Sequence, residues 1–547
     1  MSTDPRWDAV VVGSGAGGAA AAWGLCRRGL KVLVLEAGPR FEPSRDYPLN
    51  AMDWESRRFP AKPGSRGTYT YAPGQMLAGG DDLLRSRNRV VGNVNRGPTR
   101  QMVGYSHVRG VGGATLHFSG EAHRLHPASL RMRSRFGVAA DWPLSYADLE
   151  PYYCQAEDLI GVAGSDEQGA RWRSRPFPLR PHPLSWAART LGRGAAARGL
   201  NWQSNSRAAL SGPVQDRAAC NHCGGCQRGC PNGAKGSADV TFVAAAQASG
   251  RCDVRPDSAV VRIEAGENDR IAAVLVGGPE GRLERIPTPI LVLAAGAVET
   301  PRLLLASDNL GNESGQVGRN FMETLFAGVG ALHPDPQHGR RGLPSDAISW
   351  DFNAPDAIPG VIGGCRFYNA TGDIGPAGLQ AYAMRAVPGW GHGHRQAMRK
   401  SFGHALFAAA IGESIPNARS MVSLDPDQRD SYGVPLARIS AHMEESDTSR
   451  LRFMARMVLD ITLASDAEDI FESYTTWDRF LSTHVFGTCR MGDNSATSVV
   501  DAQCRSHRWQ NLFIADASVF PSSGGGEAPA LTIQALALRM AERLPRP

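Results

Sequence analysis

The glycine-rich segment near the N-terminus is the feature that most constrains the fold. Residues 8–38 read DAVVVGSGAGGAAAAWGLCRRGLKVLVLEAG: an apolar run, a glycine turn, an alanine-rich stretch and a second apolar run. This order predicts a buried β-strand, an α-helix and a second buried strand. Gly13, Gly15 and Gly18 fit the spacing GxGxxG, and Glu36 ends the second apolar run. The segment therefore predicts a dinucleotide-binding βαβ unit.

Each position of this spacing has a physical reason. Gly13 permits a tight turn, Gly15 lets the backbone approach a pyrophosphate, and Gly18 lets the helix pack on the strand. The helix N-terminus at Ala16 attracts the negative charge of the pyrophosphate. Glu36 stands where a ribose hydroxyl needs an acceptor.

The bulk properties set limits on the class of protein. A chain of 547 residues is longer than one core usually supports, so two or more domains are expected. The formal charge of +6 comes without any run of five or six like charges, which does not indicate nucleic-acid binding. No stretch of eighteen apolar residues predicts a membrane span. The chain enters its first strand-like run within eight residues, which leaves no room for a signal peptide and favours the cytoplasm.

The rest of the chain alternates between α/β patterns and irregular segments. Residues 145–164 predict a helix that opens with a Ser145/Asp148 capping box. Strands are predicted within 249–276, a strand, turn and helix at 290–306, and a helix near 445–465. The glycine-rich WGHGH segment at 390–394 is interpreted as a loop.

The C-terminal segment returns to a strand, a glycine turn and an apolar helix, so the first domain is predicted to be discontinuous. The fold class is therefore α/β, with a Rossmann-like domain and a second, substrate-binding domain built on a β-sheet with helices. The first domain is assigned residues 1–135, 205–329 and 481–547, and the second residues 136–204 and 330–480.

Four cysteines are bunched within eleven residues, whereas the other six are scattered. Cys220, Cys223, Cys226 and Cys230 have the spacing C-x2-C-x2-C-x3-C-P, the same as a bacterial ferredoxin run. Such bunching favours a metal site over disulfides. Zinc usually draws on two separated pairs of ligands, but a zinc site or no metal stays open as the alternative.

Several segments, taken in order, resemble the glucose-methanol-choline (GMC) family of flavin oxidoreductases. They are GSGAGGAAAA with Glu36, GVGGATLHFSG (110–120), LAAGAVETPRLLL (293–305), VGRNFME (317–323), HVFGTCRMG (484–492) and NLFIADASVFP (511–521). The resemblance implies a GMC fold that binds FAD in an extended groove, with NAD as the weaker alternative. The residues implied at the cofactor are Gly13, Gly15, Ala16, Gly18, Glu36, Gly112, Gly113, His117, Val260, Ala295, Asp516 and Ala517.

The resemblance also implies the chemistry. In this family an alcohol carbon is oxidised while a base takes the hydroxyl proton, and His484 matches the catalytic histidine. An imidazole suits this task because its pKa lies near working pH. The chain departs from the family at the turn before its last helix: Ala528 stands where the family has an Asn or a second His. Glu527 is the candidate to take part of that role, or a partner for His484 comes from elsewhere.

Two branches of the family refine the expectation. Large subunits of bacterial sugar and sugar-acid dehydrogenases carry C-x5-C-x3-C-P, which Cys220, Cys226 and Cys230 match. The extra Cys223 leaves a three-iron or a four-iron cluster open, and long-chain alcohol oxidases also have four cysteines. Pyranose oxidases resemble the chain at His117, which implies either a covalent bond to the flavin or a simple contact.

The sequence thus predicts an FAD-dependent dehydrogenase for a sugar, glycoside or related alcohol. An iron–sulfur cluster would export electrons to a cytochrome, a quinone or a small partner subunit. The first alternative is an oxidase with structural or zinc-binding cysteines. The second is a binding subunit with a vestigial flavin site, which Ala528 suggests. Export to the periplasm with a signal-bearing partner is the alternative to a cytoplasmic location.

Overall fold

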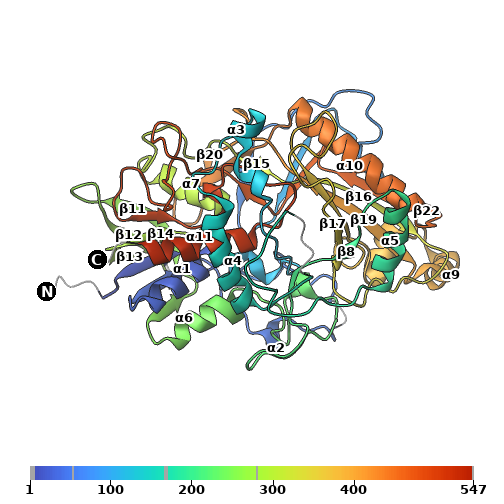
Figure 1. Cartoon of the computed structure of the whole chain (residues 1–547), viewed down its shortest axis with the longest axis horizontal. Helices are drawn as coiled ribbons and strands as arrows, with labels where there is room; N and C mark the ends of the chain where they lie inside the picture. The colour runs from blue at the N-terminus through green and yellow to red at the C-terminus, as the bar shows by residue number, and fades with distance from the viewer. Residues whose placement is uncertain (1–5, 52–53, 166–169, 279–280, 545–547) are drawn as a thin grey trace.

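A five-stranded parallel sheet forms the first lobe of the computed structural model, which describes residues 6–51, 54–165, 170–278 and 281–544 (Figure 1). Strands from near both ends of the chain belong to this sheet. The two N-terminal strands are apolar and buried at every position, as expected of strands covered on both faces. The strand order is β10 (Cys252–Arg255), β2 (Val32–Leu35), β1 (Ala9–Val12), β14 (Leu291–Leu293) and β25 (Leu512–Ile514).

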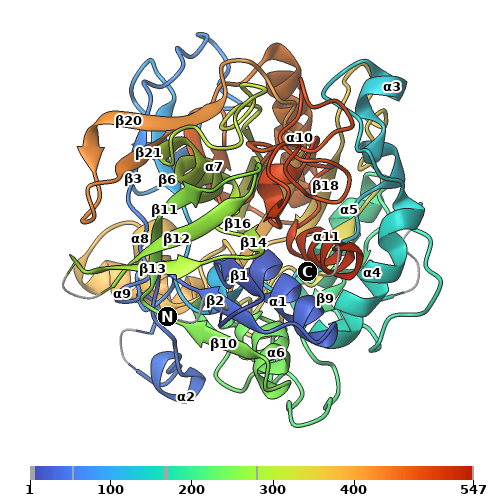
Figure 2. The ribbon, with the colours of Figure 1, turned by 90° about the vertical axis from the view of Figure 1, so that its left-hand side faces the viewer.

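The predicted βαβ unit is confirmed. Helix α1 (Ala16–Arg27) connects β1 to β2 and packs against the C-terminal helix α11 (Ala530–Arg543). The helix predicted from the capping box is α4 (Tyr146–Ile160), and both hydrogen bonds of the Ser145/Asp148 box are present. Helix α4 lies beside α11 in Figure 2, so this part of the segment assigned to the second domain packs on the first lobe.

The predicted strands within 249–276 and the helix of 290–306 are also present. A three-stranded antiparallel sheet flanks the first lobe, and helix α7 follows β14 directly. Their bounds are β11 (Ala259–Ala265), β12 (Ile271–Gly277), β13 (Leu283–Pro287) and α7 (Gly296–Ala306).

An eight-stranded antiparallel sheet forms the second lobe. Helix α10 (Glu445–Leu463), predicted near 445–465, covers it and packs against α5 (Trp186–Ala197) (Figure 1). Two short strands come from residues 87–93, a segment assigned to the first domain. The order is β5 (Gly92–Asn93), β4 (Arg87–Asn88), β22 (Asp469–Thr475), β16 (Leu325–Leu332), β19 (Ala405–Gly412), β18 (Cys365–Asn369), β17 (Ala347–Ser349) and β8 (Gln203–Ser204).

Smaller elements complete the described chain. Helices of the described residues are too short or too polar to cross a lipid bilayer. The remaining strands are β3 (Tyr69–Tyr71), β6 (Gln101–Tyr105), β7 (Val162–Ala163), β9 (Arg207–Ala208), β15 (Met322–Glu323), β20 (Met421–Arg429), β21 (Pro435–Ser440), β23 (Arg479–Ser482) and β24 (Val485–Phe486). The remaining helices are α2 (Pro43–Asp46), α3 (Met132–Phe136), α6 (Ala244–Ala248), α8 (Leu379–Arg385) and α9 (Gly391–Ser401).

Helix α9 corrects the interpretation of WGHGH as a loop. The helix begins directly after Trp390, and none of its residues is buried. Its first turn contains Gly391 and Gly393, which are poor helix formers, so the sequence indicated a loop, although the partly buried Ala397 and Met398 pack against a neighbouring apolar cluster.

A buried arginine fixes α10 onto the sheet. The guanidinium of Arg450, fully buried, donates to Asp447 Oδ1 at 3.0 Å and to the carbonyl oxygens of Gly363 and Glu413 at 3.0 and 2.6 Å. Arg450 therefore satisfies backbone groups next to the ends of β18 and β19 as well as a buried carboxylate.

We expect Arg450→Met to lower the free energy of unfolding by about 3–5 kcal/mol, because it leaves the buried Asp447 carboxylate without its cation. The matched control is Arg452→Met on the exposed side of the same helix, where the ion pairs are solvated and the loss should stay below about 1 kcal/mol. Chemical denaturation measures both, and equal losses would contradict this account of α10.

Candidate active site

One cavity of about 810 Å³ joins the two lobes. It extends from the glycine turn after β1 to residues of the eight-stranded sheet. Most of the residues predicted at the cofactor or in catalysis line it: Gly13, Gly15, Ala16, Glu36, Gly113, His117, Val260, Ala295, His484, Asp516 and Ala517. Gly18, Gly112 and Glu527 lie outside its lining.

The glycine turn leaves the cavity open to a ligand. Gly13 has φ +94°, and a Cβ there would lie 2.5 Å from the Ala294 carbonyl oxygen. A Cβ on Gly18 would lie 1.9 Å from the Gly13 carbonyl oxygen, so Gly18 allows α1 to pack on the turn. A Cβ on Gly15 would meet only the Cα of Gly113, at 3.8 Å. Gly13 and Gly18 are thus required by packing, whereas Gly15 keeps the backbone accessible from the cavity, as a bound pyrophosphate requires.

Glu36 joins three segments at the end of β2. Its Oε2 accepts from the amide and hydroxyl of Ser14 at 3.0 and 2.6 Å, and its Oε1 accepts from the amides of Gly38 and Gly110 at 3.0 Å each. Burial raises the pKa of this carboxyl, and the four hydrogen bonds act in the opposite direction. Sequence reasoning missed Ser14, although it stands inside the GSGAGG turn.

Asp516 performs a similar function at the other side of the sheet. Its Oδ2 accepts from the Gly296 amide at 2.9 Å and the Thr300 hydroxyl at 2.6 Å, and its Oδ1 accepts from the Ser518 amide at 2.8 Å. The carboxylate therefore fixes the start of α7, next to Ala295, at the edge of the cavity.

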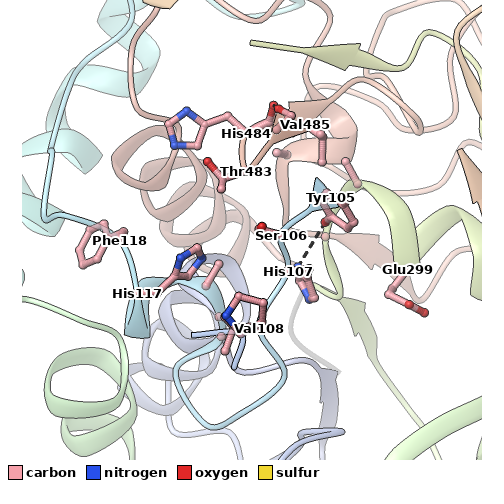
Figure 3. Close-up of a pocket in the computed structure, with 18 of the residues that line it drawn as sticks. Tyr105, Ser106, His107, Val108, His117, Phe118, Glu299, Thr483, His484 and Val485 are labelled. Atoms are coloured by element: carbon pink, nitrogen blue, oxygen red, sulfur yellow. Dashed lines mark hydrogen bonds between the residues drawn. The ribbon is translucent and has the colours of Figure 1, made fainter. Parts of the chain in front are cut away.

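Two histidines from different segments face the same part of the cavity (Figure 3). His484 precedes β24, and burial lowers its pKa to about 4, with Arg366 acting in the same direction and Glu121 against it. Burial and the charge of Lys235 lower the pKa of His117 to about 3. Both imidazoles are therefore neutral at physiological pH and can accept a proton or hydrogen bond.

The turn before α11 presents Ala528 to the cavity and directs Glu527 away from it. Glu527 Oε1 accepts from Arg171 at 2.7 Å, from the Asn353 amide at 3.0 Å and from the His126 amide at 3.0 Å. The side chain is fully buried in this ion pair. Glu527 thus fixes the turn that carries Ala528.

The four cysteines surround one small cavity of about 10 Å³. Backbone amides of His222 and Lys235 lie 3.4 and 3.3 Å from the sulfurs of Cys220 and Cys230. Burial raises the pKa of Cys226 to about 12, although Lys235 and Arg207 lower it. Within the described ranges, no three His, Cys, Asp or Glu side chains are arranged to hold a single metal ion.

The chain is similar to proteins of known family over most of its length. Two profiles described as GMC oxidoreductase match residues 109–325 and 416–537, and one described as an NAD(P)-binding Rossmann-like domain matches residues 11–44. The 6'''-hydroxyparomomycin C oxidase of Streptomyces lividus is 30% identical, covering 98% of this chain and 91% of its own. The chain belongs to the GMC oxidoreductase family. The predicted family is thereby confirmed, and with it an FAD-dependent oxidoreductase that acts on CH–OH groups.

Other GMC relatives match at similar length. The fructose dehydrogenase large subunit of Gluconobacter japonicus is 28% identical and covers 98% of this chain and 97% of its own. A formate oxidase variant of Aspergillus oryzae RIB40 has the same fold, with a TM-score of 0.65 and 15% identity, over 99% of this chain and 98% of that one. The predicted fold class is confirmed by this likeness and by the two sheets.

Several cavity residues carry no sequence signal that would have identified them. The Glu121 carboxylate forms two hydrogen bonds, of 2.6 and 2.7 Å, with the buried guanidinium of Arg366. Tyr368, on the same strand as Arg366, and Asp373, in the loop after it, also line the cavity. Arg366, Tyr368 and Asp373 belong to a segment without a recognisable motif, whereas Glu121 directly follows the GVGGATLHFSG segment but lies outside it.

We expect Gly18→Ala to lower the FAD content of the purified protein, because the added methyl overlaps the Gly13 carbonyl oxygen. For the same reason the free energy of unfolding should fall by about 1–3 kcal/mol. Gly212→Ala is the control: no atom lies within 4 Å of its Cβ position, so the change should stay within about 0.5 kcal/mol. Flavin absorbance of the purified protein and denaturant unfolding measure the effects. Full FAD content in the Gly18 variant would contradict the role assigned to this contact.

Proposed function

We propose that this GMC oxidoreductase is a dehydrogenase that oxidises a CH–OH carbon of a sugar or related polyol and delivers the electrons to an external acceptor. The observation that carries the proposal is the shared cavity, where His484 lies beside residues of the FAD site. Two relatives support the substrate class, since they are named for fructose and for a hydroxyparomomycin.

FAD, when bound, supplies the two-electron acceptor for this reaction. We assign the pyrophosphate to the turn at Gly13, Gly15, Ala16 and Gly18, and the ribose to Glu36. The other proposed contacts are Gly112, Gly113, His117, Val260, Ala295, Asp516 and Ala517. The open cradle at Gly15 supports this assignment. The neutral imidazole of His117 suits either a contact or a covalent bond to the flavin.

His484 is the proposed base. Its imidazole takes the proton from the substrate hydroxyl as the carbon is oxidised. The lowered pKa of His484 keeps the ring neutral and ready to accept this proton at neutral pH. Because Glu527 is paired with Arg171 outside the cavity, we assign it a positioning role: it holds the turn beside the substrate rather than touching it.

We expect His484→Asn to slow flavin reduction by substrate about 10²- to 10⁴-fold, because an amide cannot accept the proton. In the wild type, kcat/KM should be flat from pH 5 to 8 and fall only as pH drops through the His484 pKa of about 4. A histidine of ordinary pKa would instead halve the rate near about pH 6.5. Anaerobic stopped-flow reduction measures the rates in variants of equal FAD content, and an unimpaired variant would refute the assignment.

The cysteine run is the proposed exit for electrons. An iron–sulfur cluster, when bound, supplies a one-electron carrier. Cys220, Cys223, Cys226 and Cys230 would hold a three-iron or four-iron cluster, whose thiolates bind different iron atoms rather than a single ion. Their position around one small cavity supports this donor set.

A buried lysine next to the run also favours negative charge there. The ammonium of Lys235, 2% exposed, donates to the carbonyl oxygens of Leu116, Phe118 and Cys226 at 2.8, 3.1 and 2.7 Å. Within the described part of the chain it has no carboxylate ion pair. Nearby thiolates, which form when a metal binds, stabilise this buried cation more than the carboxylate of Asp239 does.

We expect Cys226→Ser to lose bound iron and dye-linked turnover while substrate still reduces the flavin. Cys223→Ser separates the cluster types: it keeps iron if three cysteines suffice and loses it if all four bind. Cys252→Ser, outside the run, is the control. Iron analysis and electron paramagnetic resonance measure the cluster. Unchanged dye-linked turnover in the Cys226 variant would contradict electron transfer through this cluster.

An oxidase with structural or zinc-binding cysteines is the second candidate function. One observation favours it: a relative at 30% identity is named as an oxidase. Oxygen consumption with stoichiometric peroxide, from a yellow and iron-free protein, would identify this function.

The proposed acceptor is a cytochrome, a quinone or a small partner subunit. We propose a cytoplasmic location, with export beside a signal-bearing partner as the alternative. Fractionation of cells that produce the protein with and without such a partner distinguishes the two locations.

A further inference from the structure

Two carboxylates line the cavity near the eight-stranded sheet, and their partners differ. Glu121 is saturated: both oxygens accept from Arg366, and Oε1 also accepts from the Asn205 amide at 2.8 Å. The ion pair neutralises its charge. Glu121 therefore has little capacity left for a ligand.

Asp373, in the loop after β18, accepts fewer hydrogen bonds than Glu121. Its Oδ2 accepts from the Ser345 hydroxyl at 2.8 Å, and its Oδ1 accepts from the side-chain amide of Gln227. Among the described residues it has no arginine or lysine ion pair. A carboxylate offers about four acceptor positions, so about two remain for hydrogen-bond donors in the cavity.

Asp373 lies in the catalytic part of the cavity. The Thr324 amide donates to the His484 carbonyl oxygen at 3.2 Å, directly before β16. From there the cavity follows one stretch of the sheet: its lining includes Phe326, Ile411 and Tyr368 on the neighbouring strands β16, β19 and β18, and Asp373 in the loop after β18. Gln227, the residue after Cys226, also lines the cavity. Because its side-chain amide nitrogen donates to Asp373, its side-chain carbonyl oxygen is an acceptor close to the carboxylate.

The chemistry of this pair selects among ligands. Adjacent hydroxyl groups donate two hydrogen bonds to one carboxylate, which is how an acidic residue recognises a ribose. An ammonium group is the other donor that a carboxylate attracts. The proposed polyol substrate supplies adjacent hydroxyl groups, so a diol is the ligand that agrees with the function proposed for this cavity.

We propose that Asp373 and Gln227 form a subsite for the hydroxyl group next to the reacting carbon, which makes the enzyme prefer vicinal diols to monohydroxy alcohols. The proposal rests on the proposed function, since it names the substrate class of that same cavity. Asp373 is a specificity residue here. Ser345, outside the cavity lining, donates one of the two side-chain hydrogen bonds that Asp373 accepts, and the other comes from Gln227.

The test separates binding from turnover. Pinacol is a vicinal diol whose carbinol carbons carry no hydrogen, so it cannot be oxidised, and tert-butanol is its monohydroxy counterpart. Titration of the FAD holoenzyme with each, followed by perturbation of the flavin spectrum, gives the two dissociation constants. We expect Asp373→Asn to weaken pinacol binding about 10- to 100-fold and to change tert-butanol binding less than about threefold.

Kinetics with propylene glycol and n-propanol provide the second measurement. The ratio of their kcat/KM values for flavin reduction should fall in Asp373→Asn by a similar factor. Ser345→Ala is the matched control: it removes the outer hydrogen bond but keeps the carboxylate, so both ratios should stay near wild type. Equal losses for diol and monohydroxy ligands, or a matching effect of Ser345→Ala, would overturn the proposal in favour of a purely structural role.

The outcome is distinguishable from failure of the proposed function. If no alcohol reduces the flavin, the dehydrogenase assignment fails, while the pinacol titration still decides the subsite. If an amino alcohol binds the wild type more tightly than propylene glycol and loses this advantage in Asp373→Asn, the subsite binds cations and the diol proposal is wrong.

Discussion

The carboxylate of Glu36 is the junction on which the FAD site depends. It joins the glycine turn through Ser14, the end of β2 through Gly38, and the segment that leads to His117 through Gly110. A buried carboxylate is costly unless hydrogen bonds satisfy it, and here four donors do so. Because these donors come from chain positions up to 96 residues apart, the wall that carries His117 is fixed only when all three segments are in place.

The sequence predicted those helices and strands whose apolar residues recur on one face or whose ends carry a capping box. The strand, helix and strand at residues 8–38, the capped helix α4 and the helix α10 each have such periodicity or a capping box. Helix α9 was interpreted as a loop because Gly391 and Gly393 at its start are poor helix formers, although its partly buried Ala397 and Met398 contact an apolar cluster. The pairing of β4 with β22 was equally hidden, because two-residue strands carry no periodicity.

Site residues that belong to a motif could be predicted from the sequence. Residues whose role depends on the direction of their side chains could not. Sequence identified His484 and the glycine turn, which the structure places on one cavity. It could not tell that Glu527 turns toward Arg171 and leaves Ala528 at the cavity. Arg171 lies in an irregular segment with no signal of its own, so only the folded chain reveals this ion pair. The arrangement of Glu121 with Arg366 depends in the same way on contacts 245 residues apart.

The strand order of the first sheet has a consequence for how the protein is made. Its strands begin at residue 9 and end at residue 514, and β14 needs β25 as its second neighbour. During synthesis β14 must therefore wait, with its outer edge unpaired, until almost the whole chain has left the ribosome. Exposed strand edges promote aggregation, which makes the interval between translation of β14 and of β25 a vulnerable stage in the life of this chain.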